Sequence, residues 1–191
     1  MMEFLANNQQ TIVILHVFSM GVALGVTTVA DFLFFRFLRD LKISQQESEI
    51  LNTLSMIIWT VLVLIILSGL GLYLPNAESL NGSSKFMVKL TVVGIIILNG
   101  IMLNFLIGPN LTKIFGEEVN FSKSPRWVRR LAFAGGAISM TSWYSAFILG
   151  SLRKQPYSYW EILGVYLVLV AGAITMSQLV EYAYGKKRGN Q

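Results

Sequence analysis

The stretch ILHVFSMGVALGVTTVADFLFFRF, residues 14–37, decides the fold of this chain. It exceeds the roughly 20 apolar residues that an α-helix needs to cross the hydrocarbon core of a bilayer. It also contains two ionisable side chains that lipid disfavours, the chain's single histidine, His16, and the carboxylate of Asp31. The run therefore predicts a membrane-spanning helix, and these two residues are the first candidates for a functional site.

The composition of the whole chain agrees with a membrane protein. Of its 191 residues, 54% are hydrophobic and 13% are charged, whereas a soluble domain carries roughly 25% charged residues. The chain has no cysteine, which excludes disulfides, thiolate metal sites, iron–sulfur clusters and covalently attached c-type haem. A net charge of +5 could suit nucleic acid. Because the basic residues flank apolar runs, we attribute the charge to membrane topology and expect no nucleic-acid partner.

Five apolar runs predict an all-α, polytopic bundle of five transmembrane helices, with the lipid bilayer as its surroundings and residues 1–191 as a single transmembrane domain. The opening residues MMEFLANNQQ lack the basic region and cleavage site of a signal peptide, so we expect the first helix to be retained. The predicted spans are 11–38, 53–74, 85–108, 128–151 and 159–183.

Polar residues also mark where two of the helices begin. Ser44 is followed three residues later by Glu47, and Ser158 by Glu161. This spacing is typical of a capping box, in which the serine and glutamate side chains each accept a hydrogen bond from the other residue's backbone N–H. Each box lies just before or at the start of an apolar run, as a helix start requires.

The basic residues are unevenly divided between the two sides of the predicted bundle. Of the 15 lysines and arginines, all but four flank one side. Basic loops stay in the cytoplasm, so we expect a multi-pass protein of the cell membrane with its N-terminus outside and its C-terminus in the cytoplasm. The residues predicted on the cytoplasmic side are Arg36, Arg39, Lys42, Lys113, Lys123, Arg126, Arg129, Arg130, Lys186, Lys187 and Arg188.

The polar residues of the first span share one face of the helix. At about 100° per residue, Met20, Thr27 and Asp31 all lie within about 60° of His16. A charge at mid-bilayer costs about 2.5–3.5 kcal/mol on insertion scales, so we expect this stripe to face other helices. It could form a ligand or proton site. Alternatively, His16 hydrogen-bonds a neighbouring helix and Asp31 pairs with Arg36 or another basic residue, and for Asp31 we favour this ion pair.

Lys89 in the third span is the best partner for His16 by depth. His16 lies about five residues inside the outer end of its span, and Lys89 about four residues inside the outer end of its own. At about 1.5 Å per residue, both lie roughly 6–8 Å below the same surface. One site could therefore use both side chains.

Other polar residues within the spans are explained most simply by contacts between helices. Asn104 shares a face of the third span with Lys89, and we expect it to form interhelical hydrogen bonds, which polar residues commonly provide in membranes. Glu181 lies near the inner end of the fifth span, where Arg36 or Arg129 could pair with it.

Three segments carry a resemblance to a known family: ILHVFSMGVALG, IIWTVLVLIILSGLGLYL and KFMVKLTVVGIIILNG. Over residues 12–110 the chain resembles the bacterial membrane-protein superfamily of membrane protoporphyrinogen oxidase and the copper-resistance-D-like proteins. In the oxidase family, an early histidine and a later lysine are implicated in binding haem b, and His16 and Lys89 match those positions. The resemblance implies a bacterial inner-membrane protein with haem b and an oxidoreductase role. Phe86 stands where the oxidase has tryptophan, and Arg36 lies about a turn farther from the histidine than the family's arginine.

Three functions follow from these observations. The first is a haem-binding, redox-active membrane protein in which His16 is an axial ligand and Lys89 is the second ligand or a partner of a propionate. The second is a small transporter or channel for protons or metal ions, with His16 as metal ligand and the stripe from His16 to Asp31 lining the path. The third is a non-catalytic accessory protein whose polar residues only join helices.

The sequence identifies neither a catalytic residue nor a substrate or ligand for any of these functions. Because five spans in 191 residues leave little room for a closed internal cavity, we expect a homodimer under each of them.

Overall fold

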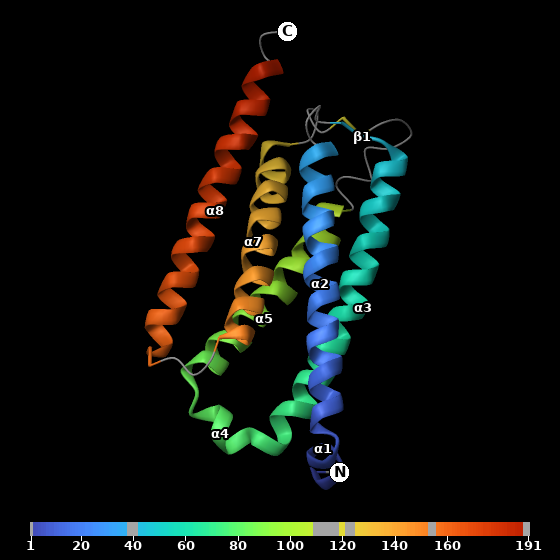
Figure 1. Cartoon of the computed structure of the whole chain (residues 1–191). Helices are drawn as coiled ribbons and strands as arrows, with labels where there is room; N and C mark the ends of the chain where they lie inside the picture. The colour runs from blue at the N-terminus through green and yellow to red at the C-terminus, as the bar shows by residue number, and fades with distance from the viewer. Residues whose placement is uncertain (1, 38–41, 109–118, 121–124, 153–155, 189–191) are drawn as a thin grey trace.

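The chain folds into an elongated bundle of helices. The computed structural model describes residues 2–37, 42–108, 119–120, 125–152 and 156–188. Within these residues, five long helices run between the two ends of the bundle, and the N- and C-termini lie at opposite ends (Figure 1).

The elements connect these ends in an up-and-down order (Figure 1). In chain order they are α1 (Met2–Asn7), α2 (Gln9–Phe37), β1 (Lys42–Ile43), α3 (Gln45–Tyr73), the 3₁₀ turn η2 (Leu74–Asn76), α4 (Ala77–Asn81), α5 (Ser84–Ile101), the π-helical segment η3 (Met102–Ile107), β2 (Val119–Asn120), α7 (Arg126–Ser151) and α8 (Tyr159–Arg188). The two-residue strands β1 and β2 pair antiparallel near the C-terminal end of the bundle. Helix α4 lies across the other end, between α3 and α5.

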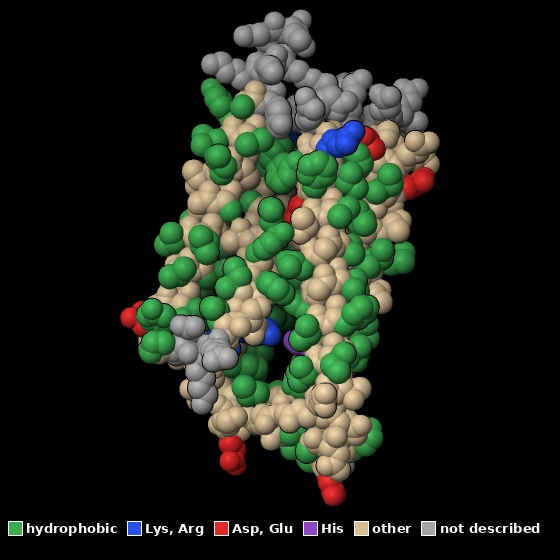
Figure 2. All heavy atoms as spheres, viewed as in Figure 1, with side chains coloured by type: hydrophobic (Ala, Val, Ile, Leu, Met, Phe, Trp, Pro, Cys, Tyr) green, Lys and Arg blue, Asp and Glu red, His purple; other side chains and the backbone are tan. Residues whose placement is uncertain are grey.

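Four stretches of helix are long and apolar enough to cross a membrane: Gln9–Phe37, Gln45–Asn81, Ser84–Ile107 and Tyr159–Ala183. The predicted helical fold is confirmed in this coarser form. The chain has the architecture of a multi-pass membrane protein, with apolar helix faces suited to contact with lipid. Figure 2 shows hydrophobic side chains over the length of the visible face, and acidic side chains mainly toward its ends.

The helix starts agree with the predicted capping boxes. The Ser44 N–H donates to Glu47 Oε2 over 2.7 Å, and the Glu47 N–H donates to Ser44 Oγ over 3.2 Å. The N–H groups of Ser158 and Glu161 make the same pair of bonds, at 2.7 and 3.4 Å. Helix α3 consequently begins at Gln45, well before the apolar run that starts at residue 53, because the capped polar turns are also helical.

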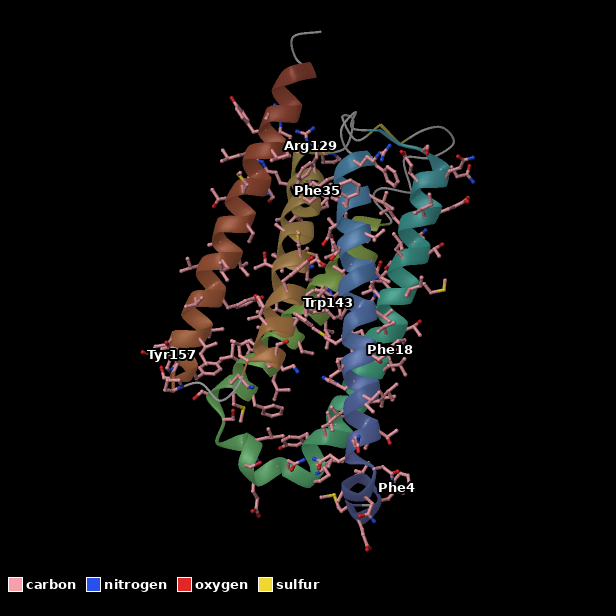
Figure 3. The ribbon with its side chains drawn as sticks, viewed as in Figure 1. Phe4, Phe18, Phe35, Arg129, Trp143 and Tyr157 are labelled. Atoms are coloured by element: carbon pink, nitrogen blue, oxygen red, sulfur yellow. The ribbon has the colours of Figure 1, made fainter. Side chains whose placement is uncertain are left out.

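Helix α7 lies in the middle of the bundle and contacts α2, α5 and α8, whereas α3 packs mainly along α2. It contains more buried residues than any other described helix, among them Trp143 at mid-length (Figure 3). Small residues allow this close packing: a Cβ built on Gly135 would lie 2.6 Å from Leu103 Cδ2. Although α7 is 26 residues long, it is not among the four helices apolar enough to span a membrane by composition.

Candidate functional site

The ring of His16 is held by a serine on the neighbouring helix. Nδ1 of His16 on α2 lies 2.9 Å from Ser68 Oγ on α3. The same hydroxyl donates to the Leu64 carbonyl over 2.6 Å. Because a hydroxyl has one proton to donate, Ser68 Oγ accepts from Nδ1–H of His16. In the neutral ring this tautomer leaves the lone pair on Nε2, which is the atom that a ligand or metal could use.

Lys89 on α5 lies in the same part of the bundle as His16. Its Nζ lies 3.5 Å from where a Cβ of Gly150 on α7 would stand. Gly69 on α3 faces the ring itself, since a Cβ there would lie 3.5 Å from His16 Cε1. Figure 2 shows the histidine with a basic side chain close by, above a hollow in this face. The site is thus assembled from α2, α3, α5 and α7.

The predicted ion pair of Asp31 with Arg36 is wrong. Asp31 Oδ2 is buried without a hydrogen-bond partner among the described residues, whereas Arg36 is exposed. Five residues on an α-helix correspond to about 140°, so the two side chains leave α2 on different faces. Asp31 therefore points into the bundle and has no basic partner among the residues that the structure describes.

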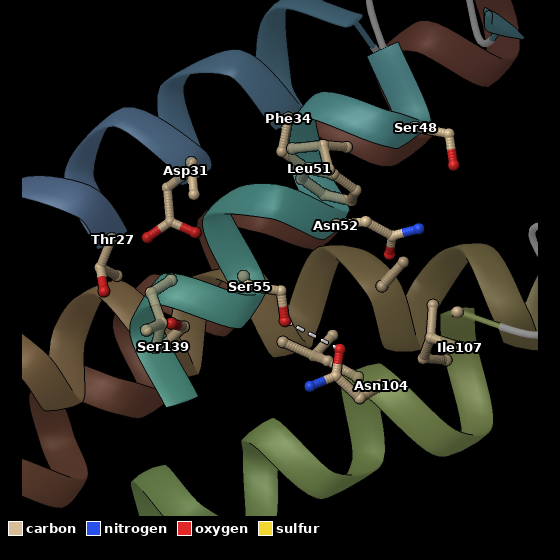
Figure 4. Close-up of a pocket in the computed structure, with 16 residues that line it drawn as sticks. Thr27, Asp31, Phe34, Ser48, Leu51, Asn52, Ser55, Asn104, Ile107 and Ser139 are labelled. Carbon is tan, nitrogen blue, oxygen red and sulfur yellow. Dashed lines mark hydrogen bonds between the residues drawn. The ribbon is translucent and has the colours of Figure 1, made fainter. Parts of the chain in front are cut away.

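Asp31 instead lines an open-sided cavity of about 390 Å³ between α2, α3, η3 and α7, in which polar side chains lie among apolar ones. Figure 4 shows its carboxylate directed toward the side chains of Thr27, Ser55 and Ser139. The polar side chains of the lining come from all four elements: Thr27, Asp31, Ser48, Asn52, Ser55, Asn104 and Ser139. His16 is not among the residues that line this cavity. The stripe on α2 does face the interior, since Met20 and Thr27 are buried. Its two ionisable residues belong to different sites: His16 contacts Ser68, whereas Asp31 lines the cavity.

The asparagines of the third span do join helices. Asn104 Oδ1 accepts a hydrogen bond from Ser55 Oγ over 3.0 Å, and Asn99 Nδ2 donates to the Gly135 carbonyl over 3.0 Å. Asn104 and Lys89 nevertheless take part in different sites. Asn104 borders the Asp31 cavity. The helix between the two residues changes to the π form at Met102, so the angle between their side chains around the helix axis differs from that in a regular α-helix.

Glu181 pairs with Arg129, one of the two partners predicted for it. The ion pair joins α8 to α7, and only 5% of Glu181 is exposed. Beside the ion pair, Gln178 Nε2 on α8 donates a hydrogen bond to the Arg130 carbonyl on α7 over 3.0 Å. Glu181 is therefore a structural residue that fixes the last helix to the bundle.

Sequence reasoning did not identify Ser68 or the polar line on α3. Ser68 gives no local signal, because its role depends on the register between two helices. Ser48, Asn52 and Ser55 are spaced i, i+4 and i+7, which places them on one helix face and could have indicated a polar track. Within the described residues there is no group of three or more His, Cys, Asp or Glu side chains able to hold a metal ion.

Comparison with protein-family models, curated proteins and solved structures finds no match to this chain. The resemblance of residues 12–110 to the oxidase superfamily stays a prediction. What the protein does must follow from the two places where polar side chains gather inside the bundle, around His16 and around Asp31.

Proposed function

We propose that this protein binds haem b inside the membrane, with His16 as axial ligand and Lys89 beside it, and has a redox role. The observation that supports the proposal is the hydrogen bond from His16 Nδ1–H to Ser68 Oγ. Histidines that ligate metals almost always donate their other ring N–H to an oxygen, which fixes the ring and leaves one nitrogen for the metal. His16 meets this requirement in the described structure.

Small residues lie beside both His16 and Lys89. Gly69 and Gly150 remove side-chain bulk next to the ring and next to Lys89 Nζ, respectively. Lys89 is half-buried, and as a cation it has three N–H donors and no lone pair. We therefore assign Lys89 to a propionate carboxylate rather than to the iron. Haem bound here would supply one-electron chemistry, while the chain supplies the ligand, its orientation and the partner for the carboxylate.

The predicted absorption spectrum tests this function. Protein purified from haem-replete cells should show a Soret band, and His16→Ala should abolish it because no other histidine exists in the chain. Ser68→Ala should weaken haem affinity roughly 10- to 100-fold, as loss of outer hydrogen bonds to metal ligands does. Asp31→Asn serves as the control and should keep the band. A colourless protein that also fails to take up added haemin would refute the proposal.

The proposal includes five spans, in which α7 joins the four more apolar helices, with the N-terminus outside and the C-terminus in the cytoplasm. Exposed aromatic side chains support two interfacial belts, Trp127 and Tyr182 toward one end and Tyr157 and Trp160 toward the other. Because the chain lacks cysteine, single introduced thiols can report orientation. Ser79→Cys should react with an impermeant reagent in intact bacterial cells, and Gln45→Cys only after permeabilisation; the reverse pattern would contradict the topology. Native mass spectrometry of the same protein tests the expected homodimer.

A further inference from the structure

The cavity around Asp31 has the chemistry of a cation site. We propose that it binds a small monovalent cation of the size of Na⁺, held between the Asp31 carboxylate and uncharged oxygen atoms of α2, α3, η3 and α7. This inference is independent of haem binding, because His16 does not line the cavity.

Two buried oxygen atoms in this cavity have no hydrogen-bond partner in the described structure. They are Asp31 Oδ2 and Thr27 Oγ1, one helical turn apart on α2. Thr27 is 2% exposed, so bulk water does not compensate its hydroxyl. Unpartnered polar atoms, and carboxylates above all, are costly in a low-dielectric interior. A single cation between the two atoms would satisfy both at once.

The remaining polar groups of the cavity are also oxygen donors. Ser55 donates its proton to Asn104 Oδ1, so the lone pairs of Ser55 Oγ stay available to a cation. Ser139 faces the same space from α7 (Figure 4). Carboxylate, hydroxyl and amide oxygens favour hard cations over soft ones such as copper. Asp31 is the one charged side chain in the described lining, and a single negative charge balances a monovalent ion.

The helix that closes the cavity departs from α geometry at this place. Residues Met102–Ile107 form the π-helical segment η3, which contributes Leu103, Asn104 and Ile107 to the lining. π-Helical turns are rare and are found frequently at functional sites. Here the altered turn presents Asn104 to Ser55 across the cavity, so the irregular geometry and the polar lining coincide.

A line of polar side chains connects the cavity to one end of the bundle. Ser48, Asn52 and Ser55 follow each other along α3 and all border the cavity. Ser48 lies in the first turn of α3, just after its capping box, and Asn52 is exposed. Figure 4 shows these three side chains spaced along α3, with Asp31 on the neighbouring α2. An ion entering from this end would pass a hydroxyl or amide oxygen at each helical turn of α3.

Thermal unfolding in detergent tests the site. The full chain is titrated with NaCl or KCl, with choline chloride replacing either salt at constant ionic strength. Wild type should show a saturable rise in melting temperature with Na⁺, on the order of 5–10 °C near 100 times the dissociation constant. Asp31→Asn, which keeps the side-chain shape, should lose the rise. Thr27→Val should shift the midpoint of the titration about tenfold toward higher Na⁺.

Two control variants separate this site from other effects. Ser19 also has a buried, unpartnered hydroxyl on α2 but does not line the cavity, so Ser19→Ala should keep the full response. His16→Ala should also keep it, which distinguishes failure here from failure of haem binding. The proposal is overturned if Na⁺ and K⁺ act no differently from choline, or if Asp31→Asn responds as wild type does.

Discussion

Replacing Arg129 with alanine is expected to lower the free energy of unfolding by about 3–5 kcal/mol, because it leaves a buried carboxylate without its partner. Arg129 on α7 pairs with Glu181 on α8, and the Glu181 side chain is 6% exposed. The pair lies where α8 meets α7 near the C-terminal end of the bundle, and Figure 3 labels Arg129 there. Water cannot take over the role of the guanidinium at this depth.

The melting temperature in detergent measures this effect and should fall on the order of 10 °C. A double variant, Arg129→Met with Glu181→Leu, should return close to wild type, since a buried ion pair is often replaced by apolar residues without loss. Glu78→Ala, at an exposed position on α4, serves as a control and should change little. Equal losses in the single and double variants would show that packing, and not the unpaired charge, sets the stability.

Phe133→Ala is expected to cost about 3–5 kcal/mol, the range for removing a fully buried aromatic ring. Phe133 on α7 is 0% exposed, and its ring centroid lies 6.4 Å from that of Phe34 and 6.1 Å from that of Phe35, both on α2. In a membrane the loss comes from packing, including the edge-to-face contact with Phe35, because lipid is as apolar as the interior. The cavity left behind would separate α2 from α7.

The matched control is Phe32→Ala on α2, where the ring is 65% exposed. Its loss should have little effect on the melting temperature, since this ring contacts detergent in the folded protein and in the unfolded protein alike. If Phe32→Ala and Phe133→Ala were equally harmful, the described packing of α2 on α7 would be wrong.

The helices could be predicted because the bilayer allows few alternatives. Inside lipid every backbone N–H and C=O must be satisfied within the protein, so a long apolar run becomes a helix. The capping boxes at Ser44 and Ser158 are local patterns, and both form. The fourth of the five predicted spans is the exception, because hydropathy alone does not identify α7 as a span. Residues 126–151 are helical, but their glycine and hydroxyl residues lower the hydropathy that identifies a span.

The sites could be predicted only as far as depth and helix face determine them. Depth along two spans predicts that His16 and Lys89 lie at the same level, and the spacing of residues along α2 predicts its inward face. Neither rule gives the rotation of one helix against the next. That rotation decides which side chains surround the Asp31 carboxylate, and that Ser68 hydrogen-bonds the ring of His16. The π-helical turn before Asn104 is equally invisible in sequence, because it depends on contacts with α3 and α7.

The small and hydroxylated surface of α7 has a consequence for how the protein is made. In the proposed five-span arrangement, α2, α3, α5 and α8 are apolar enough to partition into lipid by themselves. Helix α7 gains less from lipid and more from the neighbours that bury it. We expect the ribosome-bound chain to hold α7 weakly in the membrane until α8 has emerged and Glu181 has reached Arg129. Truncation before α8 should thus leave α7 prone to slip out and be degraded.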